Sequence, residues 1–242
     1  MYSNELNLAK HIAANVGDML KKRRSEVRIE AEEDKDIKIN LDKIAENSIM
    51  QQLVSRFNYP ILSEETGRIG IIKNDSIFWI IDPLDGTLNY SRGISLSCIS
   101  IALFKGNVPL VGVIYDFNND EMFSGVCGVG SWLNDKPLIR PRKRPIGQSV
   151  LATGFSIYGV QSEIQFQRLA ELSKKFKKIR LLGSAALSLA YVACGRVDAY
   201  SEEYIKIWDI AAGLAINRAL GIETDLQFLD DDLINISIGV HL

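Results

Sequence analysis

The chain has 242 residues, of which 47% are hydrophobic and 24% charged, and its formal net charge is −2. This composition is typical of a folded globular protein with a substantial core, and it excludes disordered and low-complexity classes. The near-neutral charge gives no global basic field of the kind that nucleic-acid-binding proteins carry, so small molecules or protein surfaces are the expected partners.

The sequence shows no sign of export or of a membrane anchor. Its N-terminus carries acidic and polar side chains where a signal peptide is apolar. No run approaches the ~18 uninterrupted apolar residues of a membrane-spanning helix. The cysteines are few and lie in apolar contexts, which favours reduced core thiols over disulfides: Cys98, Cys127 and Cys194. We therefore expect a soluble, cytoplasmic protein without membrane partners.

The N-terminal half is expected to contain two amphipathic helices followed by a mostly antiparallel sheet. Apolar residues at helical spacing predict helices over 4–24 and 41–57. A buried strand is expected at 77–82, and β-forming runs over 95–138 are separated by turn residues and glycines. The glycines at 125–130 lack the strand–turn–helix context of a dinucleotide-binding fingerprint.

The C-terminal half alternates strands and helices. Helices are expected near 163–177, 184–194 and 208–220, and strands near 149–153, 179–182, 197–200 and 233–240. A basic, proline-flanked segment at 139–147 is the expected linker. It divides the chain into an N-terminal α+β half (1–145) and a smaller C-terminal α/β half (146–242). The predicted fold class is therefore α/β (α+β).

The stretch IFWIIDPLDGTLNY ends a buried run with two carboxylates three positions apart. Its proline and glycine stop the strand, so Asp82 and Asp85 are expected at the strand's carboxyl end, where open α/β sheets bind ligands. Two such carboxylates repel each other unless a cation lies between them, and hard divalent cations prefer oxygen ligands. The Leu84 carbonyl can add an oxygen, and the Gly86 and Thr87 amides can bind an anion. A metal site beside an anion-binding loop predicts that a metal-activated water attacks a phosphate ester.

Two further acidic segments are candidates for the same site. ILSEETG places Glu64 and Glu65 at the end of a short apolar run, and WDIAAG places Asp209 in the first turn of a helix. Each also has a plain structural explanation. The glutamates could be solvated turn residues, and Asp209 could be an acid that the helix dipole favours.

The motifs in this order resemble those of the inositol monophosphatase family of lithium-sensitive, Mg²⁺-dependent phosphatases. EE is followed by DPLDGT and then by WDIAAG, while GSAALSLAYVACGRVDAY and GVGSWLNDKPL resemble two further family segments. The length and the segments LDKIAE and LGSAA are most similar to archaeal members, in which one enzyme often hydrolyses both inositol monophosphate and fructose 1,6-bisphosphate. The resemblance implies a layered αβαβα sugar-phosphatase fold and a homodimer or tetramer.

The resemblance also implies roles for individual residues. It implies catalytic roles for Glu64, Asp82 and Thr87, in which Glu64 and Thr87 orient the attacking water and Asp82 bridges two ions. The implied metal ligands are Glu64, Asp82, the Leu84 carbonyl, Asp85 and Asp209. The implied substrate contacts are Gly86, Thr87, Gly183, Ser184, Ala185 and Glu202. The implied cofactors are two or three Mg²⁺ ions, for which Mn²⁺ is a possible substitute.

Three features lie at the margin of this pattern. Asp42 resembles an outer acidic residue near a third metal, but a Thr that usually precedes it is absent from residues 38–41. The segment IEAEEDKDIK falls where relatives carry a mobile catalytic loop, although its charge alone is typical of a solvated face. Candidate contacts for a second phosphate are Tyr158, Arg180 and Lys206.

Together, the residues and the resemblance predict a Mg²⁺-dependent phosphatase acting on a small-molecule phosphate ester: inositol 1-phosphate, fructose 1,6-bisphosphate or both. One alternative is a phosphatase of 3′-phosphoadenosine 5′-phosphate. Another is a regulatory relative that binds RNA or polymerase, supported only by basic runs at 140–144 and 174–180, so nucleic acid is not the expected partner. A serine or cysteine nucleophile lacks a base, because His11 lies on an amphipathic helix and His241 is next to the terminus.

Overall fold

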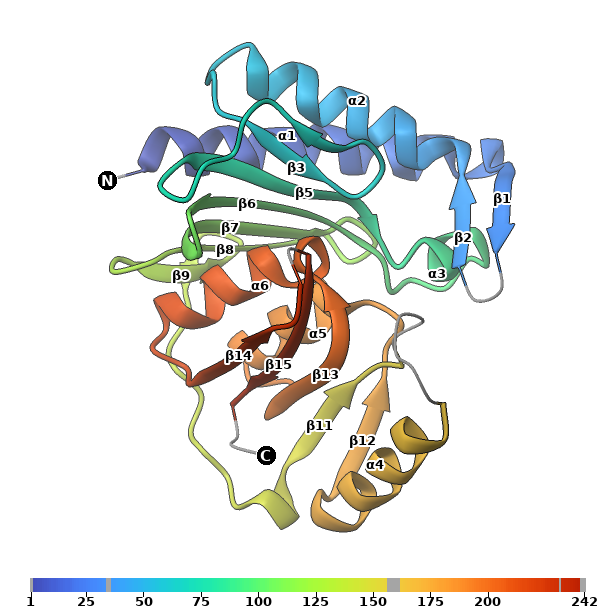
Figure 1. Ribbon diagram of the computed structural model, residues 1–242, viewed down its shortest axis with the longest axis vertical. Helices are drawn as coiled ribbons and strands as arrows, with labels where there is room; N and C mark the ends of the chain where they lie inside the picture. The colour runs from blue at the N-terminus through green and yellow to red at the C-terminus, as the bar shows by residue number, and fades with distance from the viewer. Residues whose placement is uncertain (1, 34–35, 156–161, 231, 240–242) are drawn as a thin grey trace.

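The computed structural model describes residues 2–33, 36–155, 162–230 and 232–239. Its elements form five layers: two helices, an eight-stranded sheet, two helices, a five-stranded sheet and one outer helix (Figure 1). This order confirms the layered αβαβα architecture that the sequence resemblance implied. Within the described part of the chain, no helix is both long and apolar enough to cross a bilayer.

The helices are α1 (Ser3–Arg23), α2 (Asn40–Val54), α3 (Thr87–Ser91), α4 (Ser162–Lys175), α5 (Ala185–Ala193) and α6 (Ile207–Ala219). The strands of the N-terminal half are β1 (Ile29–Glu33), β2 (Asp36–Ile39), β3 (Ile61–Ser63), β4 (Gly67–Ile69), β5 (Ile77–Asp85), β6 (Cys98–Lys105), β7 (Val108–Asp116), β8 (Glu121–Val126), β9 (Gly130–Leu133) and β10 (Lys136–Pro137). Those of the C-terminal half are β11 (Val150–Thr153), β12 (Lys178–Leu181), β13 (Ala199–Lys206), β14 (Thr224–Phe228) and β15 (Leu233–Ile238).

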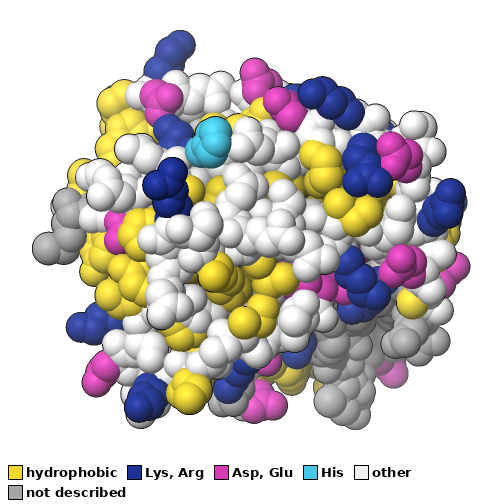
Figure 2. All heavy atoms as spheres, turned by 90° about the horizontal axis from the view of Figure 1, so that it is seen from above, with side chains coloured by type: hydrophobic (Ala, Val, Ile, Leu, Met, Phe, Trp, Pro, Cys, Tyr) yellow, Lys and Arg dark blue, Asp and Glu magenta, His cyan; other side chains and the backbone are white. Residues whose placement is uncertain are grey.

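Helices α1 and α2 cover the outer face of the large sheet. The residues that α1 buries recur at helical spacing: Ala9, Ile12, Ala13, Val16 and Leu20. Gly17 allows the close approach of this helix to β7, since a Cβ there would lie 2.6 Å from the Tyr115 ring. Seen from this side, positive and negative side chains are interspersed and neither sign dominates (Figure 2).

The large sheet has the order β10-β9-β8-β7-β6-β5-β3-β4, and only the β3–β5 pair is parallel. Strand β5 lies deep inside it, with every residue after Ile77 buried. Trp79 and Ile81 pack toward the outer helices, while Phe78 and Ile80 belong to the core around α5 and α6. Both faces are covered, which explains why the sequence of β5 is apolar without alternation.

The middle helices join the two sheets in one hydrophobic core. Side chains of α5 and α6 pack with residues of β5 and β6 on one side and of β13 and β15 on the other. The smaller sheet has the order β12-β11-β13-β15-β14, and α4 covers its outer face. Residues 138–145, near the expected linker, have no regular structure and connect the sheets.

Three expectations about secondary structure were wrong. The strand expected at 77–82 continues to Asp85, because an irregularity in its pairing with β6 accommodates the proline. The segment 29–38, whose charge alone is typical of a solvated face, contributes the antiparallel strands β1 and β2 instead, and Ile37 and Ile39 of β2 are buried. Strands β4 and β14 were not predicted, since each is a short edge strand whose pairing depends on a partner rather than on its own pattern.

The closest approach between α6 and the large sheet yields a stability prediction. A Cβ on Gly112 of β7 would lie 2.2 Å from the Ala212 carbonyl oxygen, so Gly112→Ala must push α6 off the sheet. We expect a loss of about 3 kcal/mol in the free energy of unfolding, measured by urea denaturation. Gly147→Ala is the control, because its nearest neighbour is 4.0 Å away. Equal stability of the two variants would contradict this account of the packing.

Candidate active site

The end of β5 departs from regular pairing at Pro83. Asp82 lies opposite Ser100 of β6. Asp85 lies opposite Cys98, so three steps along β5 match two along β6. Side chains three positions apart on a regular strand face opposite sides, and the extra residue of this bulge turns both aspartates to the side of α5 and α6. The proline, which has no N–H to donate, occurs where the ladder is already interrupted.

Glu64 brings a second segment to this point. It directly follows β3, which runs parallel to β5, so its carboxylate reaches the same end of the sheet as Asp82. The two side chains share a hydrogen bond. Burial raises the pKa of Glu64 to about 8. Burial, with the charge of Glu64 and of the other acids, also raises the pKa of Asp82 well above its usual range. Without a cation, the pair therefore keeps a proton near neutral pH.

Asp85 is held at the N-terminus of α5. Its Oδ2 accepts hydrogen bonds from the Ser184 hydroxyl at 2.5 Å and from the Ala186 amide at 2.8 Å. Ser184 is also the N-cap of this helix, and its hydroxyl accepts from the Leu187 amide at 3.2 Å. Burial raises the pKa of Asp85, although these hydrogen bonds act in the opposite direction. The C-terminal half thus orients an acid of the N-terminal half.

Asp209, in the first turn of α6, adds a third segment. The Lys206 backbone forms a hydrogen bond with its carboxylate. Burial raises the pKa of Asp209 well above its usual range, and the charges of Glu64 and Asp85 add to this rise. Such mutual influence requires that the carboxylates lie close together, so the structure gathers acids from three distant stretches of chain.

The loop after β5 packs tightly against the turn before α5. Gly86 has a φ of +83°, and a Cβ there would lie 2.6 Å from the Leu96 carbonyl oxygen and 3.2 Å from that of Gly183. Asn89 links the same parts, since its Nδ2 donates to the carbonyls of Leu96 and Leu182, each at 2.8 Å. Glycine is needed at position 86 for both conformational and steric reasons.

The predicted backbone and hydroxyl groups of this loop contact each other. The Leu84 amide donates to Asp82 Oδ1 at 3.0 Å. The Thr87 hydroxyl donates to the Leu84 carbonyl at 2.9 Å. The oxygen lone pairs of Thr87 therefore point away from this carbonyl and can accept a proton from another partner.

Glu202 lies on β13 at the opposite wall. Its Oε2 accepts from the Tyr200 hydroxyl at 2.7 Å, and burial raises its pKa to about 7. Gly154 leaves room for this carboxylate, because a Cβ at that position would come within 2.3 Å of Glu202 Oε2. Tyr200 and Gly154 were not singled out from the sequence, because their importance depends on the position of Glu202.

These groups line one open cavity of about 270 Å³. It contains all of the main predicted site residues: Glu64, Asp82, Leu84, Asp85, Gly86, Thr87, Gly183, Ser184, Ala185, Glu202 and Asp209. No lysine or arginine is among the described residues that line it. Arg180 is exposed and donates to the carbonyl of Ile179, and Lys206 lies over the Trp208 ring; neither lines the cavity. Tyr158 lies outside the described residues.

Sequence reasoning missed a buried acid that supports Glu64. Glu46 of α2 is 1% exposed and accepts hydrogen bonds from the Ser63 hydroxyl and from Thr66, whose amide lies at 2.9 Å and hydroxyl at 2.5 Å. These bonds hold the turn that contains Glu64. The available signal was an acid on the apolar face of α2, four positions after the similarly buried Asp42.

Asp42 and the β1–β2 hairpin border the site. Asp42 Oδ2 accepts from the Ile39 amide at 2.8 Å at the start of α2, and Asp42 is not among the residues that line the cavity. Ile37 does line it, and Lys38 pairs with Glu65 at 3.1 Å. The hairpin therefore contacts the site rather than standing in solvent. The alternation of apolar Ile37 and Ile39 was the overlooked signal.

Comparison with known proteins supports the motif assignment. Residues 1–237 match the Inositol monophosphatase family. The chain belongs to this family. Among family relatives, a protein named Nus factor SuhB from Pasteurella multocida is 39% identical over 230 residues, covering 92% of this chain and 85% of its own. Inositol monophosphatase 1 from Solanum lycopersicum is 33% identical over 223 residues, covering 89% and 82%.

Solved structures of family proteins agree with the fold. The extragenic suppressor protein suhB from Bartonella henselae superposes with a TM-score of 0.87 at 31% identity, covering 96% of this chain and 93% of that one. An inositol monophosphatase from Anabaena (Nostoc) superposes with a TM-score of 0.83 at 31% identity, covering 98% and 90%. These relatives are bacterial or plant proteins, so they do not support the expected likeness to archaeal dual-specificity enzymes.

The donor groups of the site fit the Mg²⁺ that this family generally uses. All are hard oxygen ligands, and burial raises the pKa of each carboxyl group, an effect that a bound cation would offset. No three Asp, Glu, His or Cys side chains among the described residues converge on one point as a closed ligand cage.

The raised pKa of Glu64 predicts how stability depends on pH in chelator. The pKa of Glu64 is 4.5 in the unfolded chain and about 8 in the folded chain. Between pH 4.5 and 8 the folded chain therefore binds a proton on Glu64 that the unfolded chain does not bind. The protonation of Glu64 contributes fully to the free energy of unfolding below pH 4.5, and this contribution is lost as the pH rises through 8. We expect the melting temperature to fall by several degrees from pH 5 to 8, with a shallower fall in Glu64→Gln. Mg²⁺ should stabilise most at high pH, and parallel melting profiles would contradict this assignment.

Proposed function

We propose that this member of the inositol monophosphatase family is a Mg²⁺-dependent phosphatase of sugar or polyol phosphate monoesters. The observation that carries the proposal is that Glu64, Asp82, Asp85 and Asp209 line one cavity, with no lysine or arginine among its described lining residues. Such a site repels a phosphate dianion unless it first binds cations. Mg²⁺ held by these carboxylates and the Leu84 carbonyl would offset that charge and make water a better nucleophile.

In this proposal, the residues of the chain position the water and the phosphate. Glu64 accepts the proton of the attacking water. Thr87 already donates its own proton to the Leu84 carbonyl, so its oxygen is an acceptor for the second proton of that water. The Gly86 and Thr87 amides contact the phosphate, and the tight packing around Gly86 keeps them in place.

The opposite wall supports a polyol as the leaving group. Tyr200 donates to one oxygen of Glu202, which leaves Oε1 of the same carboxylate to accept a hydroxyl of the substrate. A polyol phosphate carries several hydroxyl groups beside its phosphate, and one of them can donate to this oxygen of Glu202. A second phosphate would instead meet acidic and apolar walls, because Arg180 and Lys206 do not line the cavity. This disfavours fructose 1,6-bisphosphate and 3′-phosphoadenosine 5′-phosphate relative to inositol 1-phosphate.

The central role of Asp82 can be tested by neutralising it. We expect Asp82→Asn to lower kcat/KM for inositol 1-phosphate by at least ~100-fold, because a neutral amide binds Mg²⁺ much more weakly than the carboxylate of Asp82 does. Phosphate release in Mg²⁺ is the measurement, and excess chelator should abolish the wild-type activity. Asp75→Asn, at an exposed loop acid, is the control and should keep full activity. Substantial turnover by the Asp82 variant would exclude this mechanism.

Substrate choice gives a second test of the site. We expect kcat/KM for inositol 1-phosphate to exceed that for fructose 1,6-bisphosphate by about tenfold or more. A factor of this size corresponds to one charge-assisted hydrogen bond, which the second phosphate of the bisphosphate would lack. Arg180→Gln and Lys206→Gln should change the two values by equal factors. A selective loss with the bisphosphate in either variant would show that the side chain reaches a second phosphate after all.

A regulatory role is the second candidate, because relatives at 39% identity are named Nus factor SuhB. The structure gives this role little electrostatic support. Within the basic run 140–144, Lys143 pairs with Glu223 at 3.1 Å and Arg144 with Asp198 at 3.4 Å.

Fluorescence anisotropy with single-stranded RNA at increasing salt separates the two roles, because binding through phosphates weakens steeply with salt. We expect no such binding. Tight, salt-sensitive binding that Arg140→Gln and Arg142→Gln remove would favour the regulatory role.

A further inference from the structure

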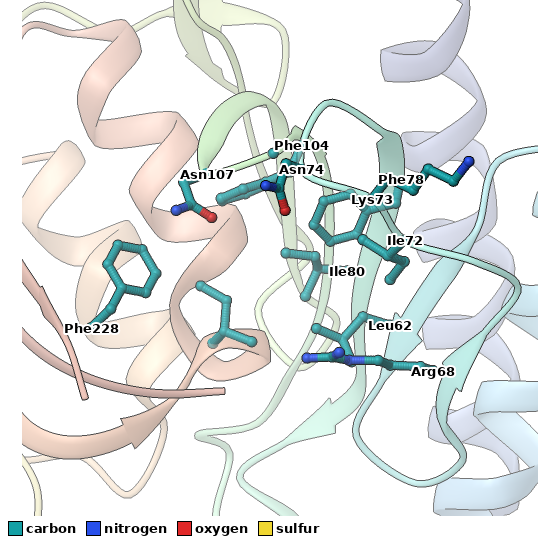
Figure 3. A pocket seen from close by; sticks show the side chains of 12 residues that line it. Leu62, Arg68, Ile72, Lys73, Asn74, Phe78, Ile80, Phe104, Asn107 and Phe228 are labelled. Carbon is teal, nitrogen blue, oxygen red and sulfur yellow. The ribbon is translucent and has the colours of Figure 1, made fainter. Parts of the chain in front are cut away.

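A second cavity lies beside the candidate active site and takes no part in the proposed reaction. It measures about 460 Å³, compared with about 270 Å³ for the carboxylate cavity, and falls within the size range of small-molecule sites. Figure 3 shows it between strands of the large sheet on one side and Phe228 with the start of α6 on the other.

Seven of the twelve residues that line this cavity are apolar, and the others are polar residues or glycine. Phe78, Ile80 and Phe104 are at most 8% exposed and form a surface on β5 and β6, where the two phenyl rings lie 6.3 Å apart. Phe228 stands across the gap from them and is 45% exposed (Figure 3). A large aromatic side chain left in contact with water, facing other aromatic rings, is suited to a flat apolar ligand.

Polar groups occupy the two ends. Arg68 of β4 reaches into the cavity at one end, and Asn74 and Asn107 lie at the other (Figure 3). Arg68 pairs with Asp232 at 3.5 Å, and half of its side chain is exposed, so its guanidinium can contact a ligand in addition to its partners within the protein. No Asp or Glu is among the described residues that line the cavity.

The two cavities share structural elements without sharing lining residues. Leu62 precedes Glu64 by two positions along β3, and Ile80 precedes Asp82 by two along β5. Successive positions of one strand face therefore line first the apolar cavity and then the carboxylate site. The first favours apolar, anionic molecules, whereas the second is strongly acidic, so their ligands differ in class.

We propose that this second cavity binds a small, elongated molecule with a flat apolar ring and one acidic group. The ring lies between Phe228 and the Phe78–Phe104 surface, and the acidic group accepts hydrogen bonds from Arg68. A polyol phosphate does not fit here, since its hydroxyls would face apolar walls. The proposal goes beyond the phosphatase reaction and does not depend on it.

Isothermal titration calorimetry of the full chain with 2-naphthoate tests the site, and 2-naphthamide serves as the neutral probe of the same shape. We expect one naphthoate per chain and about tenfold weaker binding of naphthamide. Arg68→Gln should remove the preference for naphthoate. Phe228→Ser and Asn107→Trp, both at exposed positions, should weaken both probes at least fivefold by removing a wall and by covering the mouth. Lys143→Gln is the matched cation control and should bind as wild type.

Two results would overturn the proposal. One is an absence of naphthoate binding, or equal affinity of the two probes in wild type. The other is displacement of naphthoate by saturating inorganic phosphate with Mg²⁺, which would place the probe in the carboxylate site. Circular dichroism confirms the fold of each variant. Because the measurement uses no phosphatase activity, its failure is distinct from a failure of the proposed function.

Discussion

Repulsion among carboxylates gathered at one end of β5 is the constraint on which the site depends. Asp82 and Asp85 come from one strand, and Glu64 and Asp209 arrive from other segments, so the ionised cluster favours opening of the very contacts that form it. Protons relieve this repulsion in the metal-free chain, as the raised pKa values show. A divalent cation relieves it without removing the negative charge from the oxygens, which is the state that phosphate chemistry needs.

The surrounding fold opposes this repulsion through attachments on every side. Glu46 anchors the turn that contains Glu64, and the N-terminus of α5 anchors Asp85. The close contact between Gly112 and Ala212 holds α6, the helix that carries Asp209, against the large sheet. These anchors come from the outer and the middle helical layers, which cover the two faces of the large sheet. The layered architecture therefore has a specific consequence for the site: acids from distant stretches of sequence are held rigidly enough to remain close.

Family membership by itself does not decide what the chain does, because relatives of similar identity carry the names of a phosphatase and of a Nus factor. The site itself supports catalysis, because its acids, glycine loop and hydroxyl acceptor lie in one cavity. Strand β5 also lines the neighbouring cavity, through Phe78 and Ile80. Burial of β5 on both faces makes this possible, since one strand presents apolar side chains and then acids along a single face.

The sequence by itself determined the family, the layered fold and the gathering of the main site residues, because these follow from compact motifs and from strong local patterns of apolar residues. The resemblance placed a catalytic loop at residues 29–38, but the sequence did not reveal that strands β1 and β2 form there or that Glu46 anchors the turn at Glu64, and it suggested Arg180, which does not line the cavity. Only the tertiary structure decided these points. Whether a charged side chain faces solvent, a partner or a cavity depends on which distant segment packs against it, and a bulge of one residue reverses the direction of a side chain.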